Sequence, residues 1–292
     1  MITLALAAIL VCQTEADASD NLQSSLNFHY YQQFNASITG GGDIEIASAG
    51  AELRLISDIT NEDEIEFRFQ FQRDDYDFGG STGLGALNPW GKVNTIDFTT
   101  VWIHEYDQQN RWYLGGILRA AYEDSASANA QGGATIAYAH SFSSDVTLGG
   151  GVGFIGQAND DPRAFPIIIV DWKITETLRL SSDLSTRFGS RTGLELIWTP
   201  RDDWTFGAGY SYSYSRFRLD DSGFAPGGAG EASSYPLTFR ATYSASPTFD
   251  VTFFGGIVFD GNLEVTNNNR NLMQSVDYDN AGVVGIFGKL RF

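Results

Sequence analysis

The sequence predicts an all-β fold, a transmembrane antiparallel β-barrel of the outer-membrane type with about fourteen strands, twelve being the alternative count. Three observations point to this fold: apolar and polar residues alternate along most of the chain, short and long connections alternate, and the chain ends on an aromatic residue. The last stretch, 282–292, places four apolar residues on one face: Val284, Ile286, Leu290 and Phe292. In such barrels the last strand pairs with the first and ends on an aromatic residue. We therefore expect the last strand to close the barrel, and Phe292 to serve as the assembly signal for the barrel-assembly machinery.

Composition supports this fold class and excludes others. The 292 residues are 42% hydrophobic and 14% aromatic, with 32 Gly, and the mean hydropathy is −0.17. No window approaches the roughly 20 consecutive apolar residues of a transmembrane helix, whereas strands with one apolar face need fewer. The formal net charge of −18 argues against nucleic acid as a partner, because phosphate binding needs clustered Lys and Arg.

Residues 1–18 are predicted to be a signal peptide, and residues 19–292 a single outer-membrane barrel domain. An apolar core at 2–11 precedes Ala16-Asp17-Ala18, a small-x-small cleavage pattern. The expected basic residues are missing, since Arg54 is the first Lys or Arg of the chain. Cys12 is the single Cys. Lipidation of Cys12 is the less favoured alternative, because a lipoprotein signal has a small residue before the lipidated Cys and Val11 stands there. The mature chain is therefore expected to have no disulfide.

The strands are recognised by period-two alternation. In the clearest case Ile65, Phe67 and Phe69 alternate with Glu66 and Arg68. The same pattern recurs along the chain and predicts strands near 22–36, 44–57, 63–73, 94–106, 111–123, 133–142, 146–157, 165–174, 178–188, 192–199, 204–218, 235–245, 249–263 and 280–292.

The connections between these strands alternate in length. Short turns at 107–110, 143–145, 175–177, 200–203 and 246–248 alternate with Gly- and Asp-rich segments at 74–93, 124–132, 219–234 and 264–279. Short turns on one side and long loops on the other are typical of an outer-membrane barrel. Five of the six Trp lie near short turns, and we expect them to form a periplasmic aromatic belt: Trp102, Trp112, Trp172, Trp198 and Trp204. A soluble β-sandwich or propeller is the alternative fold, but it would not collect Trp at one end.

If the apolar positions face lipid, their sequence neighbours face an interior. The candidate pore-lining residues are Glu52, Arg54, Glu66, Arg68, Asp97, Glu105, Arg119, Asp171, Lys173, Asp183, Arg187 and Arg240. They could form a charged constriction that selects ions, or ion pairs that brace the inner wall; the second interpretation is favoured. Small residues such as Gly149, Gly151 and Gly153 either leave room in the interior or permit curvature.

Catalytic chemistry is not indicated, and no cofactor or metal is expected. The chain has three His. By phase His104 and His140 face lipid, and His29 stands alone in the first strand, so no nucleophile–base site can be placed. The acidic run 74–77 and the loop 264–279 could bind Ca²⁺, but a solvated acidic loop is the favoured interpretation. The apolar loop 79–91, with Trp90, is expected to fold into the interior, packing against another subunit being the alternative.

The segment Arg216-Phe217-Arg218-Leu219-Asp220, with 225–231 and Tyr235-Pro236 after it, resembles a family of outer-membrane β-barrel proteins catalogued as a domain of unknown function. The resemblance covers most of the mature chain and implies an outer-membrane barrel, with no functional residues to carry over. More distantly, the chain is similar to fourteen-stranded transporters of hydrophobic compounds. It departs from them because no segment before the first strand could form their N-terminal plug.

The leading hypothesis is a passive, porin-like channel of the cell outer membrane for small solutes, favouring cations and not acting as an enzyme. The alternative is a closed structural or adhesive barrel acting through its extracellular loops. The expected partners are outer-membrane lipid and lipopolysaccharide, the barrel-assembly machinery, a small-molecule solute and, as an open alternative, further copies of the chain.

Overall fold

The computed structural model describes residues 22–183 and 190–292. The predicted signal peptide at 1–18 and the candidate Arg187 lie outside these residues. The described chain forms one closed antiparallel barrel, in which each wall strand is hydrogen-bonded to its neighbours in the ring and the last strand pairs with the first. The barrel strands and one short helix are β1 (Leu22–Ser37), β2 (Asp43–Asp58), β3 (Asp63–Gly79), α2 (Gly83–Leu87), β4 (Lys92–Glu105), β5 (Asn110–Glu123), β6 (Gln131–Ser143), β7 (Val146–Gln157), β8 (Asp160–Lys173), β9 (Leu178–Ser181), β10 (Ser190–Arg201), β11 (Trp204–Arg218), β12 (Ala229–Ser246), β13 (Phe249–Thr266) and β15 (Ala281–Arg291).

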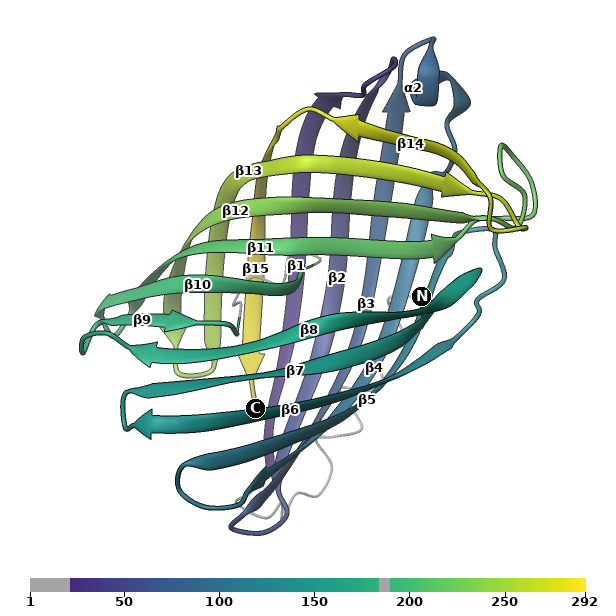
Figure 1. Ribbon diagram of the computed structural model, residues 1–292. Coiled ribbons are helices and arrows are strands. Elements are labelled where there is room, and N and C mark those ends of the chain that lie inside the picture. Colours follow the sequence, from purple (N-terminus) through teal and green to yellow (C-terminus); the bar gives the residue numbers. More distant parts are fainter. Residues whose placement is uncertain (1–21, 184–189) are drawn as a thin grey trace.

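Fourteen described strands form the wall, as the alternation predicted. A fifteenth, β14 (Leu272–Tyr278), pairs with the end of β13 but lies outside the ring, because β13 itself pairs with β15. In Figure 1 the strands β1–β4 cross β11–β13 of the opposite wall at a wide angle, as strand tilt in a closed barrel requires. No helix of the described part of the chain is both long and apolar enough to cross a membrane.

The two ends of the barrel differ. The turns that join β2 to β3, β4 to β5, β6 to β7, β10 to β11 and β12 to β13 lie at one end, together with the start of β1 and the end of β15; we call this the short-turn end. The segment carrying α2, the β11–β12 connection and β14 lie at the other, which we call the long-loop end (Figure 1).

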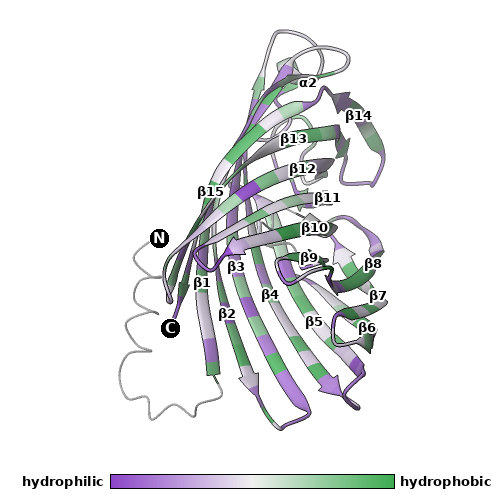
Figure 2. Cartoon of the chain, turned by 90° about the vertical axis from the view of Figure 1, so that its left-hand side faces the viewer, coloured by the Kyte–Doolittle hydropathy of each residue, from purple (hydrophilic) through white to green (hydrophobic). Residues whose placement is uncertain are grey.

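Near the short-turn end, the wall is apolar outside and polar inside. On β3 the side chains of Phe67 and Phe69 are exposed, Phe69 by 50%, whereas Glu66 is buried. The same alternation of hydrophobic and hydrophilic residues marks β1–β5 in Figure 2. Between residues 65 and 69 of β3, the apolar side chains are therefore the more exposed ones.

Farther along the same strands the polarity is reversed. Beyond position 72 of β3, Asp75 and Asp77 are exposed, whereas Tyr76 and Phe78 are buried, by 93% and 92%. Strand direction and parity are unchanged, so the apolar side chains now face inward. This part of the barrel resembles a soluble β-sandwich, with an apolar centre and a polar surface.

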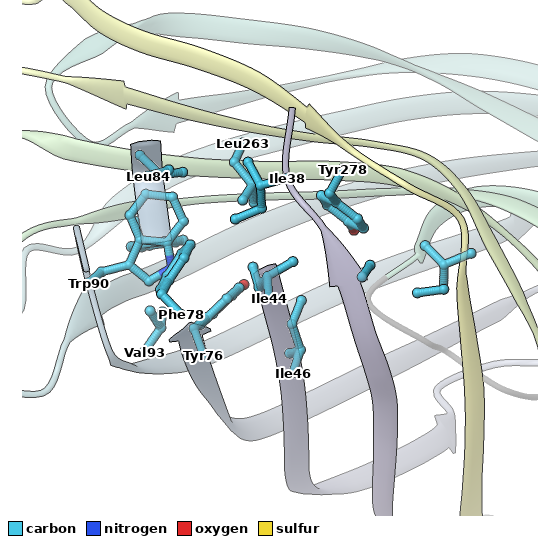
Figure 3. Packing of buried hydrophobic residues seen from close by; sticks show 14 of the residues in the cluster. Ile38, Ile44, Ile46, Tyr76, Phe78, Leu84, Trp90, Val93, Leu263 and Tyr278 are labelled. Atoms are coloured by element: carbon cyan, nitrogen blue, oxygen red, sulfur yellow. The ribbon is translucent and has the colours of Figure 1, made fainter. Parts of the chain in front are cut away.

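These inward apolar residues form one buried cluster at the long-loop end, shown in Figure 3. Trp90 packs edge-on against Phe78 and against Phe217 of β11, with ring centroids 5.2 and 5.3 Å apart. We call the following residues the apolar cap: Ile38, Ile44, Ile46, Tyr76, Phe78, Leu84, Trp90, Val93, Phe217, Leu219, Leu263, Val265 and Tyr278. The prediction that the apolar loop with Trp90 folds into the interior is confirmed.

Several predicted boundaries at the long-loop end are wrong. The segments 74–93, 219–234 and 264–279 were expected to be loops, but β3 continues to Gly79, β12 begins at Ala229, and β13 continues to Thr266. The short elements α2 and β14 were not predicted. The physical reason is the reversal of polarity: once the acidic residues of β3 face outward, their pattern resembles that of a solvated loop.

Candidate functional site

The interior contains two polar cavities that share one lining residue, Gln70. The larger, of about 370 Å³, lies toward the short-turn end, and we call it the short-turn cavity. The smaller, of about 170 Å³, lies under the apolar cap, and we call it the cap cavity. Tyr76 and Tyr278 belong both to the cap and to the lining of the cap cavity. These two polar cavities inside the barrel are the candidate functional site.

Arginine–carboxylate pairs cross the short-turn half of the interior. Arg54 of β2 donates to both oxygens of Glu66 on β3, at 2.8 and 3.0 Å, and Arg68 contacts the same carboxylate. Arg240 of β12 donates from Nε to Glu195 Oε1 at 2.6 Å, with side chains only 5% and 2% exposed. Arg54, Glu66, Arg68 and Arg240 are among the candidate interior residues, and in the structure each of them forms an ion pair.

The charges that line the short-turn cavity nearly balance. Its carboxylates are Glu52, Asp183 and Asp250, and its basic groups are Arg54, Arg240, Lys289 and Arg291. Arg291 pairs with Asp250, and Glu52 accepts a hydrogen bond from Asn27 at 3.1 Å. Each strand brings these groups inward because they alternate with exposed apolar residues, for example Lys289 beside Leu290 on β15.

In the cap cavity, one bidentate pair joins neighbouring strands. Arg119 of β5 donates to both oxygens of Asp97 on β4, at 2.5 and 2.6 Å. Asp97 and Arg119 are cross-strand partners in the register, which explains why the pair forms.

Other predicted interior residues lie near the short-turn end and outside both cavities. Arg111 pairs with Glu105 at 2.6 Å, and Arg179 pairs with Asp171 at 2.5 Å, in both cases with half-exposed side chains. Lys173 is exposed at the end of β8. These residues therefore form part of the rim of the barrel.

Uncharged interior residues were missed by sequence reasoning that searched for charge. Gln70 and Gln72 line the cap cavity, as do Tyr31 and Gln33 of β1, and Asp74 lies beside them. All follow the parity of their strands. Alternation therefore also predicts the inward side of Gln70, Gln72, Tyr31 and Gln33. Asp74 escapes the prediction because its acidic run, 74–77, resembles a loop.

The five Trp residues all lie near the short-turn end. Each occupies a position of its strand that alternation places on the same side as the exposed apolar residues. Trp112, Trp172 and Trp198 are exposed, and Trp204 stacks on Phe206 with centroids 5.9 Å apart. The backbone N–H of Phe292 donates to the carbonyl of Ser24 at 3.1 Å, so the chain end is bonded to the first strand.

The long-loop end is closed by polar contacts as well as by the cap. Arg216 of β11, nearly buried, donates from Nε to the carbonyl of Ala158, between β7 and β8, at 3.0 Å and from Nη1 to Glu231 at 3.1 Å. Glu123, at the end of β5, accepts hydrogen bonds from the backbone N–H groups of Gly91 and Asp220, at 3.1 and 3.0 Å. Segments from opposite walls therefore meet across this end of the barrel.

The described residues offer no cluster of three or more His, Cys, Asp or Glu side chains that could hold a metal ion. In the acidic run 74–77, Asp74 faces the interior whereas Asp75 and Asp77 are exposed, so the three carboxylates do not converge. Of the three His, His104 bonds Asp63 at 2.9 Å, His140 bonds Asn110 at 2.9 Å, and His29 lines the short-turn cavity.

No family model matches the chain, and no curated protein matches its sequence. Solved structures match it over nearly its whole length at low identity. The translocator domain of the autotransporter NalP from Neisseria meningitidis is 10% identical, with 99% of this chain and 95% of that chain covered and a TM-score of 0.38. A Pseudomonas aeruginosa FadL homologue is 10% identical, with 93% and 90% covered and a TM-score of 0.40. The Pseudomonas putida toluene transporter TodX is 7% identical, with 94% and 90% covered and a TM-score of 0.40.

Proposed function

We propose that this protein is a barrel of the cell outer membrane that lets small solutes pass passively through its interior. The observation that carries the proposal is the pair of polar cavities, both lined by Gln70, inside a wall whose outer face is apolar near the short-turn end. An apolar outer band with half-exposed Trp at its edge fits acyl chains and headgroups. The short-turn end would then face the periplasm.

The charges at the two ends of the barrel, more than those on its inner wall, support a preference for cations. The wall of the short-turn cavity carries three carboxylates and four basic groups, so it is nearly neutral. Exposed carboxylates lie at both ends: Asp58, Glu62, Asp107, Asp145, Glu176 and Asp202 at the short-turn end, and Asp161, Asp221, Asp277 and Asp279 at the long-loop end. Acidic rims raise the local concentration of cations and lower that of anions.

The purified protein should be tested in a planar lipid bilayer with a KCl gradient across it. We expect discrete conductance steps and a reversal potential on the side that indicates K⁺ permeation. Heat-dependent gel migration would verify that the inserted protein is folded. A folded protein that leaves the bilayer silent would contradict the channel.

A closed structural or adhesive barrel is the second candidate, and the apolar cap favours it. Trp90 and Phe217 fill the interior at the long-loop end, and Arg216 and Glu123 join opposite walls there. A silent bilayer, with conductance still absent after the cap is opened by mutation, would select this candidate.

A further inference from the structure

The Asp74 carboxylate differs from four other interior carboxylates. Glu66, Asp97, Glu195 and Asp250 each lie against an arginine. Asp74 is 95% buried and lines the cap cavity, yet no Lys or Arg among the described residues forms an ion pair with it. Its oxygens accept hydrogen bonds from the Gln72 amide, at 2.9 and 3.1 Å.

A buried carboxylate without a positive partner is costly, because neutral hydrogen bonds replace only part of its hydration. The cap cavity as a whole keeps a deficit of one positive charge: Asp74 and Asp97 are acidic, and Arg119 is the single basic lining residue. A cation bound in this cavity would remove the deficit.

The rest of the lining restricts the kind of cation. Side-chain oxygens surround the space, from Tyr31, Gln70, Thr95, Ser215, Ser233 and Tyr278. The volume of about 170 Å³ holds several water-sized groups, more than a bare monatomic ion needs. One unpaired carboxylate is too few for a divalent ion, which prefers several charged oxygens. An ammonium group has three N–H donors and one charge, which matches one carboxylate among neutral acceptors.

We propose that the cap cavity is a binding site for a small protonated amine, with the Asp74 carboxylate as its counter-ion. The inference rests on the proposed function, since it names the class of solute that the channel would hold. Gln70, common to both cavities, lies on the route by which such a solute would arrive from the short-turn end.

The test uses the full folded protein in detergent micelles at pH 7 and constant ionic strength. Ethanolamine, protonated at this pH, is compared with ethylene glycol, which has nearly the same size but no charge, and with KCl. Isothermal titration gives the dissociation constant, and the unfolding temperature gives an independent reading, because a ligand of the native state stabilises it. We expect ethanolamine to bind and to raise the unfolding temperature, and the other two not to.

Two variants isolate the carboxylate. Asp74→Asn is expected to weaken ethanolamine binding at least tenfold. Asp77→Asn removes the same charge three residues along β3, where the side chain is exposed on the outer face, and should bind as the unmodified protein does. Heat-dependent gel migration verifies folding. The ligand series on the unmodified protein tests the proposal even if a variant does not fold.

No binding of ethanolamine, equal binding of ethylene glycol, equal stabilisation by KCl, or an equal loss in both variants would overturn the site. The bilayer recordings report separately on the channel. Conductance without amine binding would contradict the amine site and support the channel. Amine binding to a protein that never conducts would support the amine site and contradict the channel.

Discussion

At the scale of single residues, the interior of this barrel tolerates charge because opposite charges are placed side by side. The Arg240–Glu195 pair is almost fully enclosed, whereas the Arg179–Asp171 pair has a similar N–O distance but half-exposed side chains. Solvent screens the second pair and not the first, so equal geometry should give unequal energies.

Glu195→Ala is therefore expected to lower the free energy of unfolding by about 3–5 kcal/mol, because it leaves the Arg240 guanidinium buried without its carboxylate. Asp171→Ala is the matched control, and its effect should be about 0–1 kcal/mol. Urea unfolding in micelles, followed by tryptophan fluorescence, measures both. Equal effects of the two substitutions would contradict this account of the interior.

At the scale of elements, the connection between β3 and β4 acts as part of the interior. It brings Leu84 and Trp90 into contact with both walls. Trp90→Ala should lower the free energy of unfolding by about 3–5 kcal/mol, because it leaves a cavity in a packed cluster. If the cap blocks the solute path, the same variant should also show larger conductance steps in a bilayer. Leu87→Ala, at an exposed position of α2 in the same connection, is the control and should change neither quantity.

The turn between β4 and β5 predicts a dependence of stability on pH. Asp107 accepts hydrogen bonds from the backbone N–H groups of Gln109 and Asn110, each at 2.8 Å. The bond from Gln109, and then that from the Asn110 side chain, hold the pKa of Asp107 below its usual value of 3.8. Because the pKa of Asp107 is lower in the folded than in the unfolded protein, its ionised carboxylate stabilises the fold at pH values above the unfolded-state pKa. This contribution is lost as the pH falls through the folded-state pKa.

Asp107→Ala should therefore lower the unfolding temperature slightly at pH 6. The difference from the unmodified protein should shrink as the pH falls below about 4 and vanish in stronger acid. Thermal unfolding of both proteins across this range measures it. A difference that stays constant with pH would show that the carboxylate charge does not contribute.

At the scale of the whole molecule, a long strand such as β3 has a different outer surface at each end. On β3, Phe69 is exposed in the apolar outer band and Gln70 faces both cavities, whereas Tyr76 is buried in the cap and Asp77 is exposed. In the proposed membrane setting, lipid around one part of the outer face and water around the other would account for this reversal of polarity.

If the apolar outer band faces lipid as proposed, Phe69→Arg should destabilise the barrel in lipid vesicles by about 2–4 kcal/mol, since it places a charge on that band. Gln70→Arg adds the same side chain one residue along, but into the polar interior, and should have a much smaller effect. Reversible folding into vesicles with guanidinium chloride compares them. Equal costs would mean that the outer face is not in contact with lipid.

The sequence pattern predicted the structure best where apolar residues are the outward ones along a run of residues. The alternation at 65–69 predicted which side chains of β3 are exposed, and the aromatic end at Phe292 predicted that the last strand pairs with the first. It was wrong at 74–79, where the alternation continued with its polarity reversed. The twelve candidate interior residues came from parity alone, and parity does not say how far along the barrel axis a residue lies, so Lys173 at the rim and Asp97 beside a cavity looked alike.

The sequence by itself determined the barrel fold and indicated about fourteen wall strands, because period-two alternation is a local property that needs no knowledge of distant residues. The tertiary structure alone decided that β11 and Trp90 meet to form a cap, that Glu195 is enclosed with Arg240, and that Asp74 lies in a cavity without a basic partner. These features depend on the register and on the meeting of opposite walls, which join residues far apart along the chain.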